Sequence, residues 1–188
     1  MLYLDPHRII ETRIAESMGF DKYKMSIEHV RKVDVSADLD FQRTYNGFYR
    51  IRRNAEWRAA YYGIFEEIKN SSPTFEQIIR TLYRDTGNIE ASFSSKMLAT
   101  IRPEMPILDQ FVLTFFNLII EGYTPEERIN SAMEVYRKIV EEESKMLKDP
   151  TVKKEVKQFK EYFMDYKISD VKALDYMIWG QGRVNKYE

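Results

Sequence analysis

The sequence predicts an all-α fold, a single helical domain that spans residues 1–188 and contains about nine or ten helices. Three observations predict it. Apolar residues recur at three- and four-residue spacing along most of the chain, which is the period of a helix with one buried face. Cap residues and prolines mark repeated helix starts. No alternating pattern is long enough for a strand, and neither an internal repeat nor a low-complexity linker divides the chain.

The length and composition fit one globular domain. A chain of 188 residues can bury roughly 70% of its unfolded surface. Hydrophobic residues make up 44% of the sequence and charged residues 31%, which is an ordinary globular balance rather than a disordered one. The chain therefore needs no disulfide or metal to stabilise its core.

The absence of cysteine excludes a disulfide framework, thiolate zinc sites and a cysteine nucleophile. The net charge of −1 implies no bulk attraction to nucleic acid, although a local basic face stays open. Nothing at the start of the chain resembles a signal peptide. The longest apolar block, residues 111–120, is shorter than the roughly 20 residues of a membrane span. We expect a cytoplasmic protein that does not enter a membrane.

The first helix is predicted to start at Asp5-Pro6, where a cap residue precedes a proline, and to stop at Gly19. The residues of its apolar face are Ile9, Ile10, Ile14 and Met18. A short helix over about 26–32 is expected next, followed by a loop near residues 35–36.

Helical spacing of apolar residues continues over 39–53 and again over 57–68. The pattern leaves open whether these segments form one long helix bent near Asn54 or two separate helices. The sequence from Asn70 to Pro73 breaks the pattern.

A capping box of Thr74 and Gln77 predicts the start of the next helix, which should end at Gly87. A short helix from about Ser92 to Ile101 follows. Pro103 and Pro106 forbid its continuation, since proline lacks an N–H and clashes with the preceding turn.

Asp109 is expected to cap a helix over 111–120 that is apolar on nearly every side and belongs in the middle of the protein. Thr124-Pro125 with Glu127 marks another helix start. Asp149-Pro150 marks one more, and Ser169 is expected to begin a last helix closed by Gly180.

Several kinds of chemistry lack a signal. The chain has no Gly-x-Ser-x-Gly motif, and its two histidines, His7 and His29, have no His-Glu-x-x-His context. The acidic runs Glu66-Glu67 and Glu141-Glu142-Glu143 are expected on solvent faces. Asp34, Asp38 and Asp40 lack the neighbours that would support a magnesium site. We therefore expect neither a metal nor a cofactor.

In one segment, residues 87–112, the order of the predicted helices and turns indicates a chemical function. A helix ending at Gly87 is followed by a tight turn and by a helix with Lys96 near its start. A proline and Asp109 then precede another apolar helix. This order resembles the helix-hairpin-helix DNA glycosylases, whose hairpin reads Gly-apolar-Gly-x-Lys and is followed by an aspartate before a further helix.

The resemblance implies a helix-hairpin-helix-like core and assigns roles to particular residues. Ser92-Phe93-Ser94-Ser95-Lys96 takes the place of the hairpin, with serines where the family has glycines, and Lys96 precedes Asp109 by 13 residues. Backbone N–H groups at Ser92, Ser94 and Ser95 would hold a DNA phosphate. Lys96 would match the lysine nucleophile of the bifunctional members, and Asp109 the carboxylate that stabilises positive charge on the sugar.

A second segment, residues 43–58, concentrates positive charge. It contains five arginines against a single acid, Glu56, with aromatic residues interleaved. Arginines beside aromatics suit phosphate contact and base stacking. Arg50, Arg52 and Arg53 are therefore candidate phosphate contacts. An alternative stays open, since the aromatics also fall at core spacing and the arginines would then pair with acidic helices.

Two functions of different class follow from these segments. The first is a DNA-binding protein that is either a glycosylase with abasic-site lyase activity or a relative that has lost the chemistry; the sequence does not decide whether it is an enzyme. The second is a non-enzymatic helical protein that binds another protein or itself. In the first, Lys96 and Asp109 must face a shared hollow. In the second they point apart, and an apolar surface patch appears instead.

Overall fold

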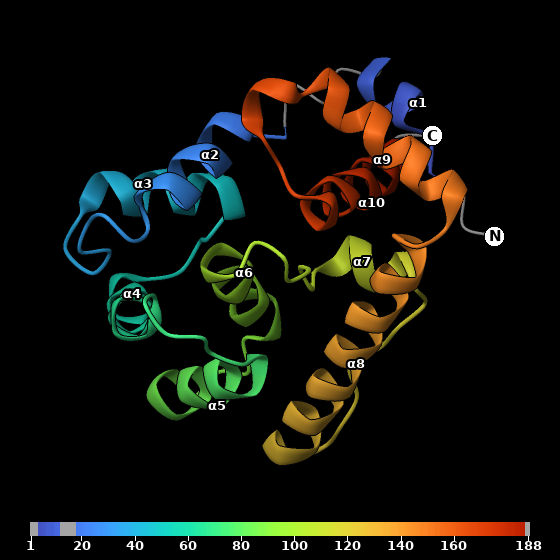
Figure 1. The fold of residues 1–188 in the computed structure, drawn as a ribbon. Coiled ribbons are helices and arrows are strands. Elements are labelled where there is room, and N and C mark those ends of the chain that lie inside the picture. Colours follow the sequence, from blue (N-terminus) through green and yellow to red (C-terminus); the bar gives the residue numbers. More distant parts are fainter. Residues whose placement is uncertain (1–3, 12–17, 187–188) are drawn as a thin grey trace.

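The computed structural model describes residues 4–11 and 18–186, and the described chain is helical without any strand, which confirms the all-α class. Figure 1 shows the arrangement of its helices. Their bounds are α1 Pro6–Glu11, α2 Phe20–His29, α3 Leu39–Tyr49, α4 Ala55–Ile68, α5 Phe75–Thr86, α6 Ala91–Ile101, α7 Gln110–Phe115, α8 Pro125–Met146, α9 Pro150–Tyr162, the 3₁₀ helix η2 Met164–Tyr166, and α10 Asp170–Lys186. No helix among these is long and apolar enough to cross a lipid bilayer.

Two helices occupy the interior. α6 packs against α2 and α5, and α10 packs against α1, α7 and α9. Figure 1 shows α6 surrounded by α2–α5 on one side and by α7 and α8 on the other. Eight of the eleven residues of α6 are buried, and the buried residues of α10 include Ala173, Leu174 and Met177. The side chains that α6 and α10 contribute to the space between them therefore come from buried helices.

The expectation of a central helix over 111–120 is wrong. α7 ends at Phe115, and Asn117 adopts a left-handed backbone with φ of 52°, which no continuing helix contains. Thr114, Asn117 and Ile119 are exposed, so the apolar run is partly a surface connection. A run of apolar residues alone does not show which side each one faces.

The helix starts that rest on cap residues are confirmed. Thr74 and Thr124 each form the complete capping box, and the carboxylates of Asp109 and Asp149 accept hydrogen bonds from the first turns of α7 and α9. Asn54 caps α4, which settles the open question of residues 39–68 in favour of two helices. Capping is a local interaction, which makes it readable from sequence.

Other boundaries differ from expectation. The short helix expected over about 26–32 is α2, which begins at Phe20 after Gly19 takes a left-handed conformation. Part of the first predicted helix, including Ile14, lies outside the described residues.

Gly180 does not close the last helix, because α10 continues through it and through Gly182. Both glycines allow close approach. A Cβ at Gly180 would lie 2.7 Å from Cγ2 of Ile9, and a Cβ at Gly182 would overlap Cδ1 of Phe111. Glycine is required here by packing rather than by a turn.

The acidic run in α8 is not entirely on a solvent face. Glu143 is 2% exposed, and neither of its carboxylate oxygens has a hydrogen-bond partner among the described residues. Burial, and secondarily the charge of Asp175, raises the pKa of Glu143 well above its ordinary value. In the other run, Glu66 is half-buried, where it accepts a hydrogen bond from the backbone N–H of Val35 at 2.8 Å and pairs with Lys69 at 2.7 Å.

We predict that Gly182→Ala lowers the free energy of unfolding by about 1–3 kcal/mol, because the new methyl group displaces Phe111 and α7. Gly63→Ala is the matched control. Gly63 lies inside α4, and a Cβ added there would meet no neighbouring group within 4 Å, so alanine should stabilise the protein by about 0.5–1 kcal/mol. Urea unfolding measures both. Equal effects at the two positions would contradict the close approach of α10 and α7.

A second prediction concerns Glu143. Its pKa is higher in the folded chain than in the unfolded chain, so folding stability is lost as pH rises above the ordinary value near 4.5. The loss is about 1.4 kcal/mol per pH unit until the folded pKa is reached. Glu143→Gln removes this loss and should therefore stabilise the protein more at pH 8 than at pH 5. Urea unfolding at both pH values checks it; a difference that does not change with pH contradicts it.

Candidate functional site

A hollow with a volume of about 370 Å³ lies where the end of α3, the start of α6, the start of α7 and α10 meet. Its wall is largely aromatic, from Phe48, Tyr49, Phe93, Phe111, Tyr176 and Trp179. Its charged groups are Arg50, Lys96, Asp109, Lys172 and Asp175. A concave, mainly apolar site with a few charged groups is the usual form of a small-ligand pocket.

Lys96 enters the hollow from the second turn of α6. Its amine lies 5.1 Å from the ring centroid of Phe93 and 5.8 Å from that of Tyr49, and it makes no hydrogen bond or ion pair with a described residue. Burial lowers the pKa of the Lys96 amine, and the charges of Lys172 and Arg50 lower it further, against the opposing effect of Asp109. A lowered pKa increases the fraction of neutral, nucleophilic amine at neutral pH.

Asp109 lines the same hollow from the start of α7. Its Oδ1 accepts hydrogen bonds from the backbone N–H groups of Phe111 at 2.9 Å and Val112 at 3.1 Å, which fixes the carboxylate in place as the helix cap. Oδ2 makes no hydrogen bond with a described residue. One oxygen therefore holds the side chain, and the other stays available for a ligand.

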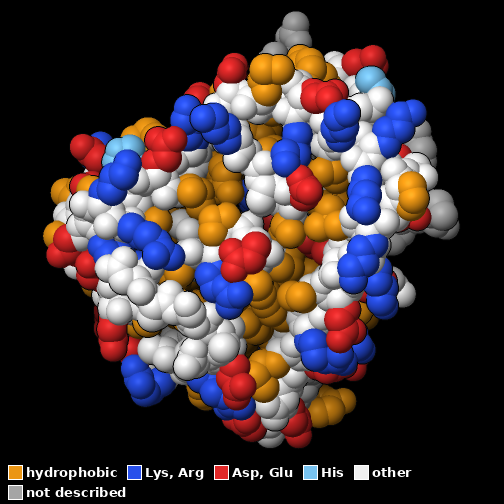
Figure 2. Space-filling view, viewed as in Figure 1, with side chains coloured by type: hydrophobic (Ala, Val, Ile, Leu, Met, Phe, Trp, Pro, Cys, Tyr) orange, Lys and Arg blue, Asp and Glu red, His pale blue; other side chains and the backbone are white. Residues whose placement is uncertain are grey.

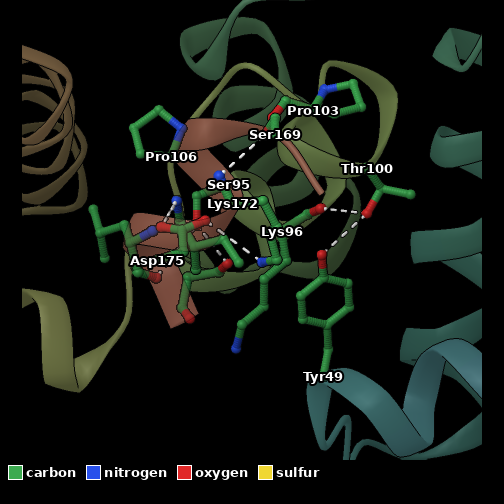
Figure 3. A network of polar contacts seen from close by, with 12 residues as sticks. Tyr49, Ser95, Lys96, Thr100, Pro103, Pro106, Ser169, Lys172 and Asp175 are labelled. Carbon is green, nitrogen blue, oxygen red and sulfur yellow. Dashed lines mark hydrogen bonds and ion pairs between the residues drawn. The ribbon is translucent and has the colours of Figure 1, made fainter. Parts of the chain in front are cut away.

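The relative position of Lys96 and Asp109 is set by their sequence neighbours. The hydroxyl of Ser95 accepts a hydrogen bond from the N–H of Leu108 at 2.9 Å and donates to the carbonyl of Ser92 at 2.9 Å. Figure 3 shows the buried Ser95 within this network of polar contacts. The bond from Leu108 ties the residue before Lys96 to the residue before Asp109.

Two further side chains hold the same connection. Tyr136 of α8 donates a hydrogen bond to the carbonyl of Pro106 at 2.9 Å. Asp175 of α10 accepts one from the N–H of Ile107 at 3.2 Å. Residues 106, 107 and 108 are thus each fixed by one side chain from a different helix, and Asp109 follows directly.

Lys172 and Asp175 were not among the residues singled out from the sequence. Each is only 5% exposed, and the Lys172 amine lies 3.5 Å from Oδ2 of Asp175. Burial raises the pKa of Asp175 to about 6, although Lys172 opposes the shift, and burial lowers the pKa of Lys172. The sequence offered one signal for this pair: a lysine and an aspartate stand three residues apart within the apolar pattern of α10. Charged residues are rarely buried unless they are paired.

Arg50 also lies at this hollow. It follows α3 in a left-handed conformation with φ of 54°, and its guanidinium is 5.9 Å from the ring centroid of Trp179. Arg50 therefore shares the hollow with Lys96 and Asp109, although the two sequence segments that carry them are far apart.

Arg52 and Arg53 do not line this hollow; they border a separate depression with Asp85 and Asn88. Arg53 pairs with the buried Glu90 at 2.6 Å. This ion pair with a buried carboxylate gives Arg53 a structural role. On the face shown in Figure 2, basic and acidic side chains are interspersed, so positive charge does not form one continuous surface there.

The serines fall in different places from those expected. Residues 92–96 lie inside α6, and the turn between α5 and α6 comes earlier, at residues 87–90, with Gly87 at φ of 68°. Ser94 and Ser95 are completely buried, so neither is placed to contact a DNA phosphate. Ser92 lines the hollow. The hairpin expected at residues 92–96 is therefore wrong in position, because the serines have helical rather than turn conformations.

Comparison with known proteins adds nothing to this geometry. No protein-family model, curated protein or solved structure matches the chain. Among the described residues, no group of three or more histidine, aspartate or glutamate side chains could hold a metal ion. Any assignment of function therefore rests on the hollow itself.

We predict that Ser95→Ala lowers the free energy of unfolding by about 1–3 kcal/mol, because it leaves the buried N–H of Leu108 without an acceptor. Ser92→Ala, which removes a half-buried hydroxyl on the same helix, is the control and should change stability by less than about 0.5 kcal/mol. Chemical denaturation compares them. If the two variants are equally stable, Ser95 does not hold the connection to Asp109.

Proposed function

We propose that this protein is a DNA glycosylase with abasic-site lyase activity, with Lys96 as the nucleophile and Asp109 as its electrostatic partner. The observation that carries the proposal is a half-buried primary amine and a fixed carboxylate on one aromatic-lined hollow, although 13 residues and two prolines separate them in the sequence. Strongly perturbed ionisable groups in a cleft are typical of active sites.

The chemistry begins with the neutral Lys96 amine attacking C1′ of the target nucleotide. The bond between C1′ and the base breaks, its electron pair leaves with the base, and the base takes up a proton while the attacking nitrogen loses one. Positive charge develops on the sugar as this bond breaks, and the Asp109 carboxylate stabilises it. The aromatic wall, with Phe111 and Trp179, provides surfaces against which an extruded base can stack.

The lyase step follows from the same amine. The ring oxygen leaves C1′ and accepts a proton as a C1′=N double bond forms, which gives a protonated Schiff base on Lys96. Loss of a C2′ proton then expels the 3′ phosphate, and water releases the enzyme. Arg50, at the hollow, is the candidate contact for a phosphate next to the extruded nucleotide.

The rival function, a non-enzymatic interaction protein, has less support. It expects Lys96 and Asp109 to point apart, whereas both line one hollow. Exposed apolar side chains do occur, among them Ile119 and Tyr123, but both lie in the connection between α7 and α8. Single exposed apolar residues are normal on protein surfaces.

Borohydride trapping tests the proposal. We predict that wild-type protein forms a covalent adduct with duplexes that carry an abasic site, and that Lys96→Ala forms none. Asp109→Asn keeps the helix cap but loses the charge, so it should slow adduct formation on the order of 100-fold. Lys148→Ala, at an exposed lysine, is the matched control and should behave as wild type.

The other outcomes of this experiment would contradict or reassign the proposed chemistry. No adduct with abasic or oxidised DNA from the wild type removes the proposed activity. An adduct that persists in Lys96→Ala assigns the chemistry to a different amine. DNA binding that does not weaken as salt concentration rises contradicts phosphate contact by Arg50.

A further inference from the structure

The hollow carries buried polar groups that the proposed reaction does not use. Lys172, Asp175 and Tyr176 line it, and each is 5% exposed. The hydroxyl of Tyr176 is buried and has no hydrogen-bond partner among the described residues. Buried polar groups normally have a partner, so an unpartnered hydroxyl on a residue that lines the hollow points to a ligand.

Lys172 has donors to spare. Its amine meets Asp175 at 3.5 Å, which is at the long limit of a hydrogen bond, and an ammonium has three N–H groups. Its other neighbours are aromatic faces, with ring centroids of Tyr23 and Tyr176 at 5.1 Å and 5.0 Å. Such rings attract a cation but accept no strong hydrogen bond. The hollow therefore offers donors to a ligand oxygen.

Asp175 supplies the complementary acceptor. Its Oδ1 holds the N–H of Ile107, and its Oδ2 has only the long contact with Lys172. A carboxylate has about four acceptor positions, so an additional N–H can be accommodated. Burial raises the pKa of the Tyr176 phenol well above its ordinary value, so the hydroxyl stays a donor at neutral pH.

We propose that Lys172, Asp175 and Tyr176 read the edge of the extruded base and select bases that carry a carbonyl oxygen beside a ring N–H, such as uracil and hypoxanthine. Lys172 and Tyr176 donate to the carbonyl oxygen, and Asp175 accepts from the N–H. Cytosine and adenine reverse this pattern, with an amino group beside an unprotonated nitrogen, and would leave these buried groups unpaired. The inference rests on the proposed function.

The same arrangement assists departure of the base. When the bond to C1′ breaks, negative charge spreads onto the ring nitrogen and carbonyl oxygen of the leaving base. The N–H groups of the Lys172 amine, donated to that oxygen, stabilise the charge. Lys172 thus contributes both to selection of the base and to stabilisation of the leaving group.

The test compares matched duplexes that differ in one base. Release of uracil against cytosine, and of hypoxanthine against adenine, is measured at saturating enzyme in the same sequence context. Wild type is expected to release the carbonyl base at least about 100-fold faster. Tyr176→Phe removes a hydroxyl that has no partner among the described residues, so it costs no internal hydrogen bond there; it should reduce the preference by about threefold to tenfold.

Asp175→Asn keeps an oxygen for the Ile107 N–H but can place a donor where the acceptor stood, so it should shift the preference toward the amino base. Tyr123→Phe, at a fully exposed tyrosine, is the control and should keep the wild-type ratio. If wild-type protein forms abasic-site adducts but releases uracil, cytosine, hypoxanthine and adenine equally fast, this inference alone is overturned. Wild-type protein that forms no adduct overturns the proposed function as well.

Discussion

The site depends on how the connection between α6 and α7 is held. Pro103 and Pro106 prevent this segment from being helical, so its backbone groups cannot bond within a helix. The groups are instead satisfied by buried side chains. Beyond those of Ser95, Tyr136 and Asp175, the hydroxyl of Ser169 donates to the carbonyl of Pro103 at 2.9 Å. A buried backbone group left unpaired is costly, which makes this set of bonds hard to rearrange.

This constraint gives Asp109 a fixed position relative to Lys96. The connection ends at the cap of α7, and α7 in turn packs on α10 through Gly182. The proposed catalytic pair would need such support, because small displacements of reacting groups cost large factors in rate. The buried helices α6 and α10 supply it through the hydrogen bonds of Ser95 and Asp175 to the connection.

Burying a charged group costs free energy, and several such groups are buried at or near this site. Lys96, Lys172 and Asp175 all have pKa values displaced toward the neutral form by desolvation, and the carboxylate of Glu143 is buried with no hydrogen-bond partner among the described residues. A core built only for stability would place apolar residues at such positions. Lys96, Lys172 and Asp175 all line one hollow, which supports the chemical role that we propose for it.

The features that could be predicted from sequence are the local ones. Caps such as Thr74 and Asp109 were readable because the interaction spans three residues. Lys96 and Asp109 were found as candidates by their order along the chain. Gly180 was misread because its reason is contact with Ile9, which no local pattern shows.

Features that depend on contacts between distant helices could not be predicted from the sequence for the same reason. Lys172 and Asp175 become candidate site residues only once α10 and α6 are seen to line the same hollow. Glu143 was assigned to solvent because its neighbours in sequence are charged. The buried state of Ser94 and Ser95 likewise follows from packing around α6 rather than from the hairpin motif that they resemble.

The central claim is that Lys96 is a half-buried amine in the hollow with a lowered pKa. The most direct measurement is a pH titration by NMR of isotope-labelled lysine side chains, with the Lys96 signal assigned by its loss in Lys96→Arg. The Lys96 amine should titrate below the ordinary lysine value of 10.5, with burial as the main cause of its lowered pKa. Titration of Lys96 at or above that value would contradict the claim.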